Sequence, residues 1–400
     1  MWYIGIDLGT AYSCISMMSD MDYKPYVVNN SEGRRTTPSV VWYRSPGNTV
    51  VGENAKQMKN RKNIGHIEVV DGSKRHMHDA GKTWHIENGS TFDVTPENVA
   101  TEILRYLFNL REVKNRSTLD PEYRIVITVP AKYESYERSR VINAAKAAGI
   151  NTDWLNLLEE PNAAAISYCN EYDSFNNGHL LVYDLGGGTL DVSAIDKKGN
   201  MYEVVEVDGV PNLGGRDWDR KLATAIREQY AAFRPDLTAE DIESNPQYEE
   251  IERTIESEAE RIKKEITNTG EYDDSIAGLE SDFKFNLDED DFNDLTSSLL
   301  KTSLDYLDRV IRRCEEGRTR AGRFGIDQIL LVGGSCNMNQ IVDGIRKNYP
   351  KFKGKIYYQD ADFSISKGAT YFAKKGFQPP YTALGIENYE AMSHDGDKMQ

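Results

Sequence analysis

Two carboxylates flank a run of three glycines near the middle of the chain. Asp184 precedes the glycines at 186–188, and Asp191 follows them within an apolar run that starts at Thr189. Glycine lets backbone N–H groups approach and point at phosphate oxygens. Carboxylates beside such a turn suit a hydrated Mg²⁺, which prefers oxygen ligands and keeps several waters. Taken alone, the stretch fits a phosphate-binding hairpin and an ordinary glycine-rich hairpin equally well.

A second copy of this pattern lies at the start of the chain. Residues 4–10 repeat the order of an apolar strand, Asp-Leu-Gly and Thr, with Asp7 in the position of Asp184. The two aspartates are 184 − 7 = 177 residues apart, a spacing of domain size that indicates an internal duplication. We therefore expect two hairpins that face each other and hold a nucleotide–metal complex from both sides.

Composition excludes several classes of protein. The 400 residues are 39% apolar, enough for a large core and two or three domains. The net charge of −16 argues against a nucleic-acid surface, which needs clustered Lys and Arg. The four cysteines follow neither a zinc nor a disulfide spacing, and no signal peptide or membrane-spanning run is evident. We expect a soluble cytoplasmic protein that binds neither nucleic acid nor membrane.

Strands and helices alternate around the two hairpins. A β-branched run at 124–129 stops at Pro130 and is typical of a strand covered on both faces. A helix is predicted at 133–149, followed by a strand at 155–161 that carries Glu159 and Glu160 to its end. This alternation predicts an α/β sheet whose ligands lie at the carboxyl ends of the strands.

Later segments add more glycine turns and long helices. A turn at 212–217 leads into a helix from about Trp218, and apolar stripes at 251–266 and 300–311 predict two long amphipathic helices. The first has Glu260 and Lys264 paired on its outside. The strand at 329–335 ends in paired glycines, which fits close approach to a nucleoside or an ordinary strand–helix turn.

With these motifs in this order, residues 1–375 resemble the nucleotide-binding domain of the DnaK-type heat-shock chaperones, within the actin-like ATPase superfamily. Residues 4–14 and 160–165 look more like chaperones than like sugar kinases or actin. The resemblance implies an α/β fold of two lobes, each built on one copy of a duplicated ribonuclease-H-like domain, with ATP in the cleft between the lobes. The implied division is lobe I at 1–172 (core 1–33 and 97–172, smaller subdomain 34–96), lobe II at 173–375 (core 173–212 and 299–375, smaller subdomain 213–298), and a linker or tail at 376–400.

The resemblance also assigns roles for ATP or ADP with Mg²⁺, and leaves room for K⁺. Asp7 and Asp184 would hold Mg²⁺ through water, Glu160 and Asp191 would orient water and metal, and Lys74 would contact the γ-phosphate region, with Lys82 as a competitor. With Thr10 and Thr189 these form the implied catalytic set. The implied phosphate-lining residues are Gly9, Thr10, Ala11, Tyr12, Gly186, Gly187, Gly188 and Thr189. The implied nucleoside-contacting residues are Gly214, Gly215, Glu260, Lys263, Lys264, Thr267, Gly333, Gly334, Ser335, Asn337 and Asp362.

Several positions depart from the family or leave alternatives open. Lys264 and Asn337 occupy positions where the family often sandwiches adenine between arginines, so we expect lower affinity or looser base choice. Arg216 reverses a charge at the turn that closes the lobes. Pro130 and Arg138 match a pair that relays nucleotide state, although a strand-ending proline and a surface arginine explain them equally well.

We expect an ATPase that acts as a nucleotide-driven switch. J-domain co-chaperones, nucleotide exchange factors and client peptides are the implied partners, the last through a substrate-binding domain that has no counterpart after Gly376. We therefore favour a fragment of a longer chaperone. The alternatives are a small-molecule kinase of the same superfamily, an actin-like filament protein and a weakly hydrolysing nucleotide sensor.

Overall fold

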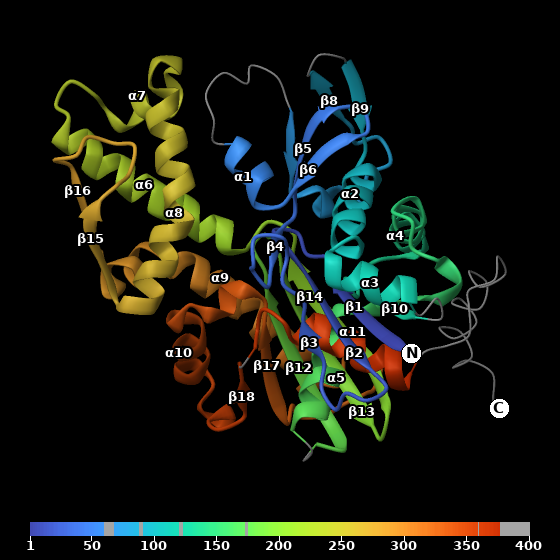
Figure 1. Cartoon of the computed structure of the whole chain (residues 1–400). Helices are drawn as coiled ribbons and strands as arrows, with labels where there is room; N and C mark the ends of the chain where they lie inside the picture. The colour runs from blue at the N-terminus through green and yellow to red at the C-terminus, as the bar shows by residue number, and fades with distance from the viewer. Residues whose placement is uncertain (60–67, 88–90, 120–122, 173–174, 359, 377–400) are drawn as a thin grey trace.

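The computed structural model describes residues 1–59, 68–87, 91–119, 123–172, 175–358 and 360–376. Within these ranges, two sheets of matching topology form the centre of the molecule (Figure 1). No helix there has the length and apolar character needed to cross a membrane. The predicted tail at 376–400 lies outside the described residues apart from Gly376.

The first sheet has the strand order β11-β10-β1-β2-β3. Its strands are β1 (Trp2–Asp7), β2 (Tyr12–Ser19), β3 (Tyr26–Val27), β10 (Arg124–Val129) and β11 (Leu155–Glu159), and β4 (Thr37–Pro38) pairs with β2 off this path. The first three strands are antiparallel neighbours, whereas β10 and β11 run parallel to β1. The hairpin predicted at the N-terminus and the buried strand at 124–129 are therefore both present.

The second sheet repeats this plan with the order β14-β13-β12-β17-β18. Its strands are β12 (Asn177–Leu185), β13 (Leu190–Lys198), β14 (Met201–Val210), β17 (Gln328–Val332) and β18 (Ile356–Tyr357). Again three strands, β12, β13 and β14, are antiparallel neighbours, and two further strands, β17 and β18, run parallel to β12 on its other side. The equal strand orders are what the predicted internal duplication requires, and the α/β fold of the actin-like ATPases is confirmed.

Two helices lie between the sheets. They are α5 (Glu160–Glu171) and α11 (Ser364–Lys375), and their small residues, such as Ala164 and Ala369, share one core with residues of both sheets. Backbones approach closely there, because a Cβ added to Gly368 would overlap the Ala163 carbonyl and one added to Gly5 would overlap the Ser366 carbonyl. These helices join the two sheets into one body (Figure 1).

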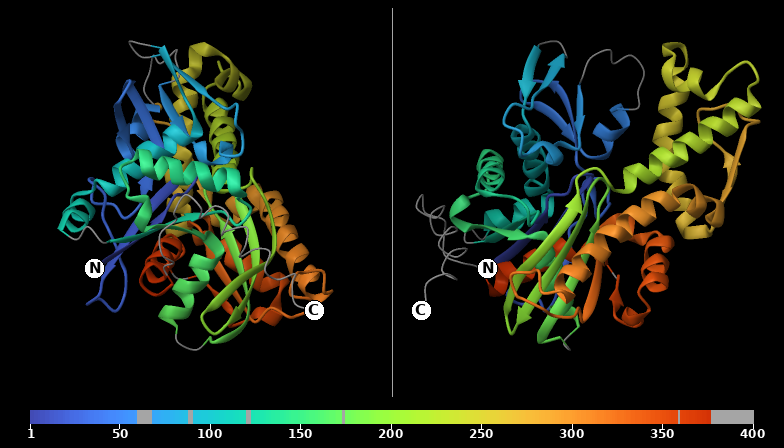
Figure 2. Two further views of the ribbon diagram at one scale, coloured as in Figure 1. Left: turned by 90° about the vertical axis from the view of Figure 1, so that its right-hand side faces the viewer. Right: turned by 180° about the vertical axis from the view of Figure 1, so that it is seen from behind.

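Further elements project above the sheets on two sides (Figures 1 and 2). One group lies in the chain between β4 and β10 of the first sheet. It contains α1 (Glu53–Lys59), β5 (Val40–Ser45), β6 (Asn48–Val51), β7 (Val69–Asp71), the 3₁₀ turn η1 (Ser73–His76), β8 (Trp84–Glu87) and β9 (Thr91–Val94). The other contains α6 (Gly215–Phe233), α7 (Ala239–Ser244), α8 (Glu249–Thr269), β15 (Glu271–Ser275) and β16 (Lys284–Asp288). The flanking helices are α2 (Pro96–Phe108), α3 (Arg111–Leu119), α4 (Ser135–Ala147), α9 (Glu289–Glu315) and α10 (Asn339–Asn348).

Helix starts account for most differences from the sequence predictions. Thr95 caps α2 by accepting a hydrogen bond from the Asn98 N–H. Glu160, however, is not the end of a strand, because β11 ends one residue earlier and α5 begins at Glu160, with Pro161 in its first turn. The helix expected from about 218 begins at Gly215 instead. Helix α11 was not predicted.

Candidate functional site

A cavity of about 1150 Å³ opens between the two hairpin turns and the elements above them. Every residue that the sequence predicts for the site lines this cavity except Gly188, Gly214 and Asp191. These three are its immediate neighbours: Gly214 packs on the backbone of the glycine turn, and Asp191 lies opposite Asp184 in the β12–β13 register. The structure therefore brings the predicted set together in one place.

The two hairpin turns touch each other. A Cβ added to Gly187 would overlap the Ala11 side chain, and one added to Gly214 would overlap the backbone of Gly187 and Gly188. Glycine at these positions thus permits contacts that a larger residue would block. The prediction that the two Asp-Leu-Gly hairpins face each other is confirmed by this contact.

The carbonyl oxygens of the triple-glycine turn are all held by hydrogen bonds from outside the turn. The donors are the Gly215 N–H and the Ser335 hydroxyl to Gly186 (3.0 and 2.9 Å), the Arg216 N–H to Gly187 (3.0 Å), and Arg75 Nη2 to Gly188 (2.6 Å). The first hairpin repeats the arrangement, because Ser39 donates its hydroxyl to the Gly9 carbonyl and its N–H to the Ala11 carbonyl, both at 2.8 Å.

These bonds determine where the N–H groups point. In a planar trans peptide the N–H is directed opposite to the carbonyl of the same unit. With its carbonyls held, the second turn directs the N–H groups of Gly187, Gly188 and Thr189 to the other side. Among the described residues, the N–H groups of Gly187 and Gly188 have no hydrogen-bond partner of their own. Converging N–H groups of this kind form an anion-binding concavity.

Four carboxylates gather beside the turns. The pKa of Asp7 is raised to about 7, chiefly by burial; Lys74 opposes this rise and the charge of Glu160 adds to it. Burial also raises the pKa of Asp184 well above its usual range, helped by the charges of Glu160, Asp191 and Asp7. The pKa of Glu160 is raised by burial as well, although Lys74 lowers it. Closely spaced carboxylates repel each other, so each ionised group favours protonation of its neighbours or the binding of a cation.

Two lysines supply part of that charge. Lys74 forms an ion pair with Glu160, and Lys132 lies 3.0 Å from Asp191. Four carboxylates against two ammonium groups leave an excess of negative charge that a divalent cation fits. The described residues contain no group of three or more His, Cys, Asp and Glu side chains that would ligate a metal directly. Asp7 and Asp184 are the residues of this cluster that could hold a hydrated Mg²⁺ through water.

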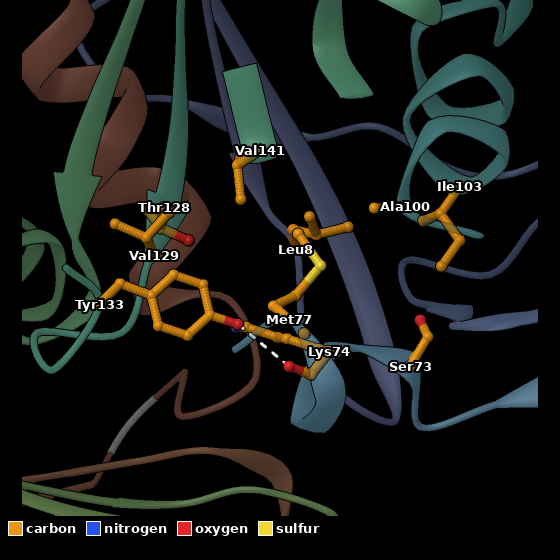
Figure 3. Close-up of a pocket in the computed structure, with 11 residues that line it drawn as sticks. Leu8, Ser73, Lys74, Met77, Ala100, Ile103, Thr128, Val129, Tyr133 and Val141 are labelled. Atoms are coloured by element: carbon orange, nitrogen blue, oxygen red, sulfur yellow. Dashed lines mark hydrogen bonds between the residues drawn. The ribbon is translucent and has the colours of Figure 1, made fainter. Parts of the chain in front are cut away.

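The structure favours Lys74 over Lys82. Lys74 lines the cavity, whereas Lys82 Nζ lies over the Trp84 ring, 4.9 Å from its centroid. Burial alone would lower the pKa of Lys74, but the charges of Glu160, Tyr133 and Asp7 raise it, so the ammonium form is retained. A small apolar pocket lies behind this segment, where the Tyr133 hydroxyl donates to the Lys74 carbonyl at 3.0 Å (Figure 3).

A polar cluster spans the cavity at its other end. The Tyr12 hydroxyl donates to Glu260 at 2.6 Å, Lys264 donates to Glu260 at 2.7 Å, and Lys56 pairs with the same carboxylate. Although burial raises the pKa of Glu260, the ammonium groups of Lys56 and Lys264 hold it well below its usual range. The predicted pair of Glu260 and Lys264 exists, but it faces the cavity and not the outside.

The remaining predicted residues lie along the same wall. Lys263 Nζ donates to the Gly215 carbonyl at 3.0 Å, and the Thr267 hydroxyl donates to the Lys263 carbonyl at 2.9 Å. Asn337 Nδ2 donates to Asp362 at 3.1 Å. Gly333 adopts a φ of 85°, where a side chain would be strained and would meet the Leu185 carbonyl. These contacts fix the part of the cavity predicted for a nucleoside.

Arg138 is not the surface arginine that one interpretation of its sequence offered. Its side chain is largely buried, donates to Glu159 at 2.9 Å, and donates to the Tyr133 carbonyl at 2.8 Å. Glu159 directly precedes Glu160, so Arg138 is one residue removed from the carboxylate cluster. Pro130 follows β10 directly and ends that strand, as predicted.

Four residues that shape the site are not indicated by any motif of the sequence. They are Ser39, Lys56, Arg75 and Lys132, and all reach it through contacts distant in the chain. Arg75 directly follows Lys74, which is the local signal that points to it. Lys132 lies just after the predicted strand end at Pro130, whereas the segments around Ser39 and Lys56 carry no motif that points to the site.

Comparisons with known proteins agree with this geometry. The family model described as "Hsp70 protein" matches residues 3–374. A curated relative, "Chaperone protein DnaK" of Mycoplasmoides gallisepticum (strain R(low / passage 15 / clone 2)), is 34% identical over 345 residues, which cover 84% of this chain and 54% of the relative. The chain therefore spans about half the length of that relative. Together with the duplicated sheets and the site between them, these matches show that the chain belongs to the Hsp70 family.

Proposed function

We propose that this chain binds ATP with Mg²⁺, hydrolyses it to ADP and phosphate, and acts as a nucleotide-driven switch for a peptide-binding domain outside the chain. The observation that carries the proposal is the pair of touching glycine turns whose carbonyls are held outward, with four carboxylates and Lys74 beside them. Phosphoryl transfer depends largely on positioning and charge neutralisation, which this arrangement supplies without a covalent intermediate.

Each residue of the site contributes a different interaction with ATP or with water. The N–H groups of the second turn bind phosphate oxygens, and Thr189 adds a hydroxyl beside them. Lys74 neutralises charge near the terminal phosphate, while Glu160 accepts a hydrogen bond from the attacking water and orients it. Bound Mg²⁺ would supply further neutralisation of the phosphate charge. Attack of water on the γ-phosphorus breaks its bond to the bridging oxygen and releases ADP and inorganic phosphate.

The switch rests on contacts that cross the cavity. Tyr12 and Lys56 reach Glu260, so the elements above one sheet are tied to those above the other. ATP and ADP fill the phosphate end differently, and the difference in their contacts biases how the two sides close. Arg138 extends the carboxylate cluster toward α4 and is our candidate for relaying the nucleotide state.

Base recognition is weaker in this proposal than phosphate recognition. Lys264 is turned onto Glu260 and lies 5.2 Å from the Tyr12 ring centroid, and the Asn337 amide is bonded to Asp362. Neither presents a planar cation to stack on a base. We therefore propose loose discrimination between purine nucleotides, with J-domain co-chaperones, exchange factors and client peptides as partners of the longer protein.

Single-turnover hydrolysis tests the proposal. The unaltered protein should convert bound ATP to ADP, and Thr189→Ala should slow this step about a hundredfold, because it removes a group that contacts the transferring phosphate. A weakly hydrolysing nucleotide sensor is the second candidate, favoured by the engaged Lys264 and Asn337. Equal and near-zero rates in both proteins, with ATP still bound, would establish the sensor and refute the ATPase.

A further inference from the structure

One arginine reaches the glycine turn from the opposite side of the cavity. Arg75 belongs to η1, above the first sheet, and its Nη2 donates to the carbonyl of Gly188 at 2.6 Å. A Cβ on Gly188 would overlap the guanidinium, so the contact depends on glycine at that position. A hydrogen bond this close fixes the orientation of the peptide that follows Gly188.

That peptide carries a donor of the anion-binding turn. The Gly188 carbonyl and the Thr189 N–H belong to one planar unit, so holding the carbonyl directs the N–H to the opposite side. The carbonyls of Gly186 and Gly187 are held by residues 215, 216 and 335, which follow the turn in the chain. The third carbonyl is held by a residue that precedes the turn by more than a hundred positions.

We propose that Arg75 is a positioning residue that completes the phosphate-binding turn from across the cavity by orienting the Gly188–Thr189 peptide. The Thr189 N–H is aligned for a phosphate oxygen when η1 lies against the turn and loses this alignment when it moves away. Approach of the two sides and assembly of the phosphate site are then the same event. This role rests on the proposed binding of ATP and deepens it.

A second contact beside the first supports the proposal. Asp71 lies 3.3 Å from Arg216, whose own N–H holds the Gly187 carbonyl. Gly72 adopts a φ of 62° between Asp71 and η1, which turns the segment toward the cavity. The segment from Asp71 to Arg75 thus holds two neighbouring carbonyls of the turn: Arg75 contacts that of Gly188 directly, and Asp71 contacts that of Gly187 through Arg216.

Electrostatics alone does not explain the placement of Arg75. Burial and the like charges of Arg216 and Arg220 lower its pKa, and the carboxylates of Asp217 and Asp71 offset only part of this, so the net effect of the surroundings on the cation is unfavourable. Its Nε is buried without a hydrogen-bond partner among the described residues. The contact with the Gly188 carbonyl is therefore the feature that gives this side chain its position.

The experiment measures binding of ATP and of adenosine to the whole chain by calorimetry in excess Mg²⁺. Arg75→Met removes the donor at similar volume, Arg75→Lys keeps a charge and a donor, and Arg220→Met is the matched control. Arg220 lines the same cavity but is mostly exposed and pairs with Asp217 at 3.1 Å. Arg75→Met should weaken ATP about tenfold and leave adenosine within about twofold, which is the size of one lost hydrogen bond. Arg75→Lys should recover most of the ATP affinity, and Arg220→Met should change neither ligand by more than about twofold.

Several outcomes would overturn the role. Equal losses of ATP affinity in Arg75→Met and Arg220→Met would mean that charge alone matters, and equal losses for ATP and adenosine would mean a general distortion. Unchanged ATP affinity in Arg75→Met, or no recovery in Arg75→Lys, would also refute it. Should Arg75→Met fail to fold, the comparison of Arg75→Lys with the unaltered protein decides, since a tenfold loss of ATP affinity there contradicts the proposal. Absence of ATP binding by the unaltered protein would instead remove the proposed function itself.

Discussion

Replacing Asp7 by asparagine should stabilise the nucleotide-free protein at neutral and alkaline pH. Burial raises the pKa of Asp7 from 3.8 to about 7, so its charged form is disfavoured in the folded state. The stability that goes with the protonated form is fully present below pH 4 and is lost as the pH rises through 7. Asparagine has nearly the same shape and stays neutral, so Asp7→Asn avoids this loss.

The magnitude follows from the pKa difference. A difference of one in pKa corresponds to about 1.4 kcal/mol, so a rise from 3.8 to about 7 sets an upper bound of about 4 kcal/mol at pH 8. Asp7 lines an open cavity and is partly accessible, so water relieves some of this cost. We expect Asp7→Asn to raise the free energy of unfolding by about 2 kcal/mol at pH 8 and by only about 0.5 kcal/mol at pH 4.5.

Urea unfolding at pH 4.5, 6, 7 and 8 in the presence of a chelator measures this difference. Asp153→Asn is the matched control, because Asp153 is exposed and its replacement should shift stability by less than about 0.5 kcal/mol at every pH. An Asp7→Asn protein that is less stable than the unaltered one at pH 8, or a difference that does not change with pH, would refute the reasoning. The same substitution should abolish stabilisation by ADP with Mg²⁺.

Three further predictions concern the turns and the contacts across the cavity. Gly188→Ala should weaken ATP binding more than tenfold in the calorimetric titration, because its Cβ overlaps Arg75. Gly186→Ala is the control: its Cβ meets its nearest neighbour at an ordinary 3.7 Å, so its affinity for ATP should stay within about threefold of the unaltered protein. Asp71→Arg and Arg216→Asp should each speed ADP release several-fold in stopped-flow displacement, and the variant with both changes should release ADP at the original rate. If the effects of the two changes on the release rate simply add, the pair does not interact. Because Asp7 must be ionised to hold hydrated Mg²⁺, and its pKa is raised to about 7, the affinity for ATP with Mg²⁺ should fall between pH 8 and 6 while binding of adenosine does not.

The parts of the site that sequence predicts are those built from neighbours in the chain. Each Asp-Leu-Gly hairpin carries its strand pattern, its turn glycines and its carboxylate within about ten residues, so local rules locate it. Glu160 lines the cavity with the other predicted residues, although it begins a helix and does not end a strand. In both cases the local segment already contains the relevant chemistry.

The parts that were missed depend on tertiary contacts or on burial from all sides. Arg75 and Ser39 hold carbonyls of turns that lie elsewhere in the chain, and no motif links a donor to a distant acceptor. Helix α11 packs on α5 and on strands β1, β2 and β10 of the first sheet, and Gly368 and Ala369 lie in these contacts. Glycine and alanine suit this close packing, but they add little to the apolar pattern by which a helix is predicted.

The seam formed by α5 and α11 limits how the molecule can deform. The main chain at Gly368 already rests on that of Ala163, as Gly5 rests on Ser366, so the sheets cannot be pressed closer together there. We therefore expect any relative movement of the two sheets to be a tilt about this line, which would displace the distant tips of β8 and α7 more than the sheets themselves (Figure 1). The close contacts of two glycines with peptide carbonyls thus restrict movement where the sheets meet and leave the largest displacements to the elements farthest from them.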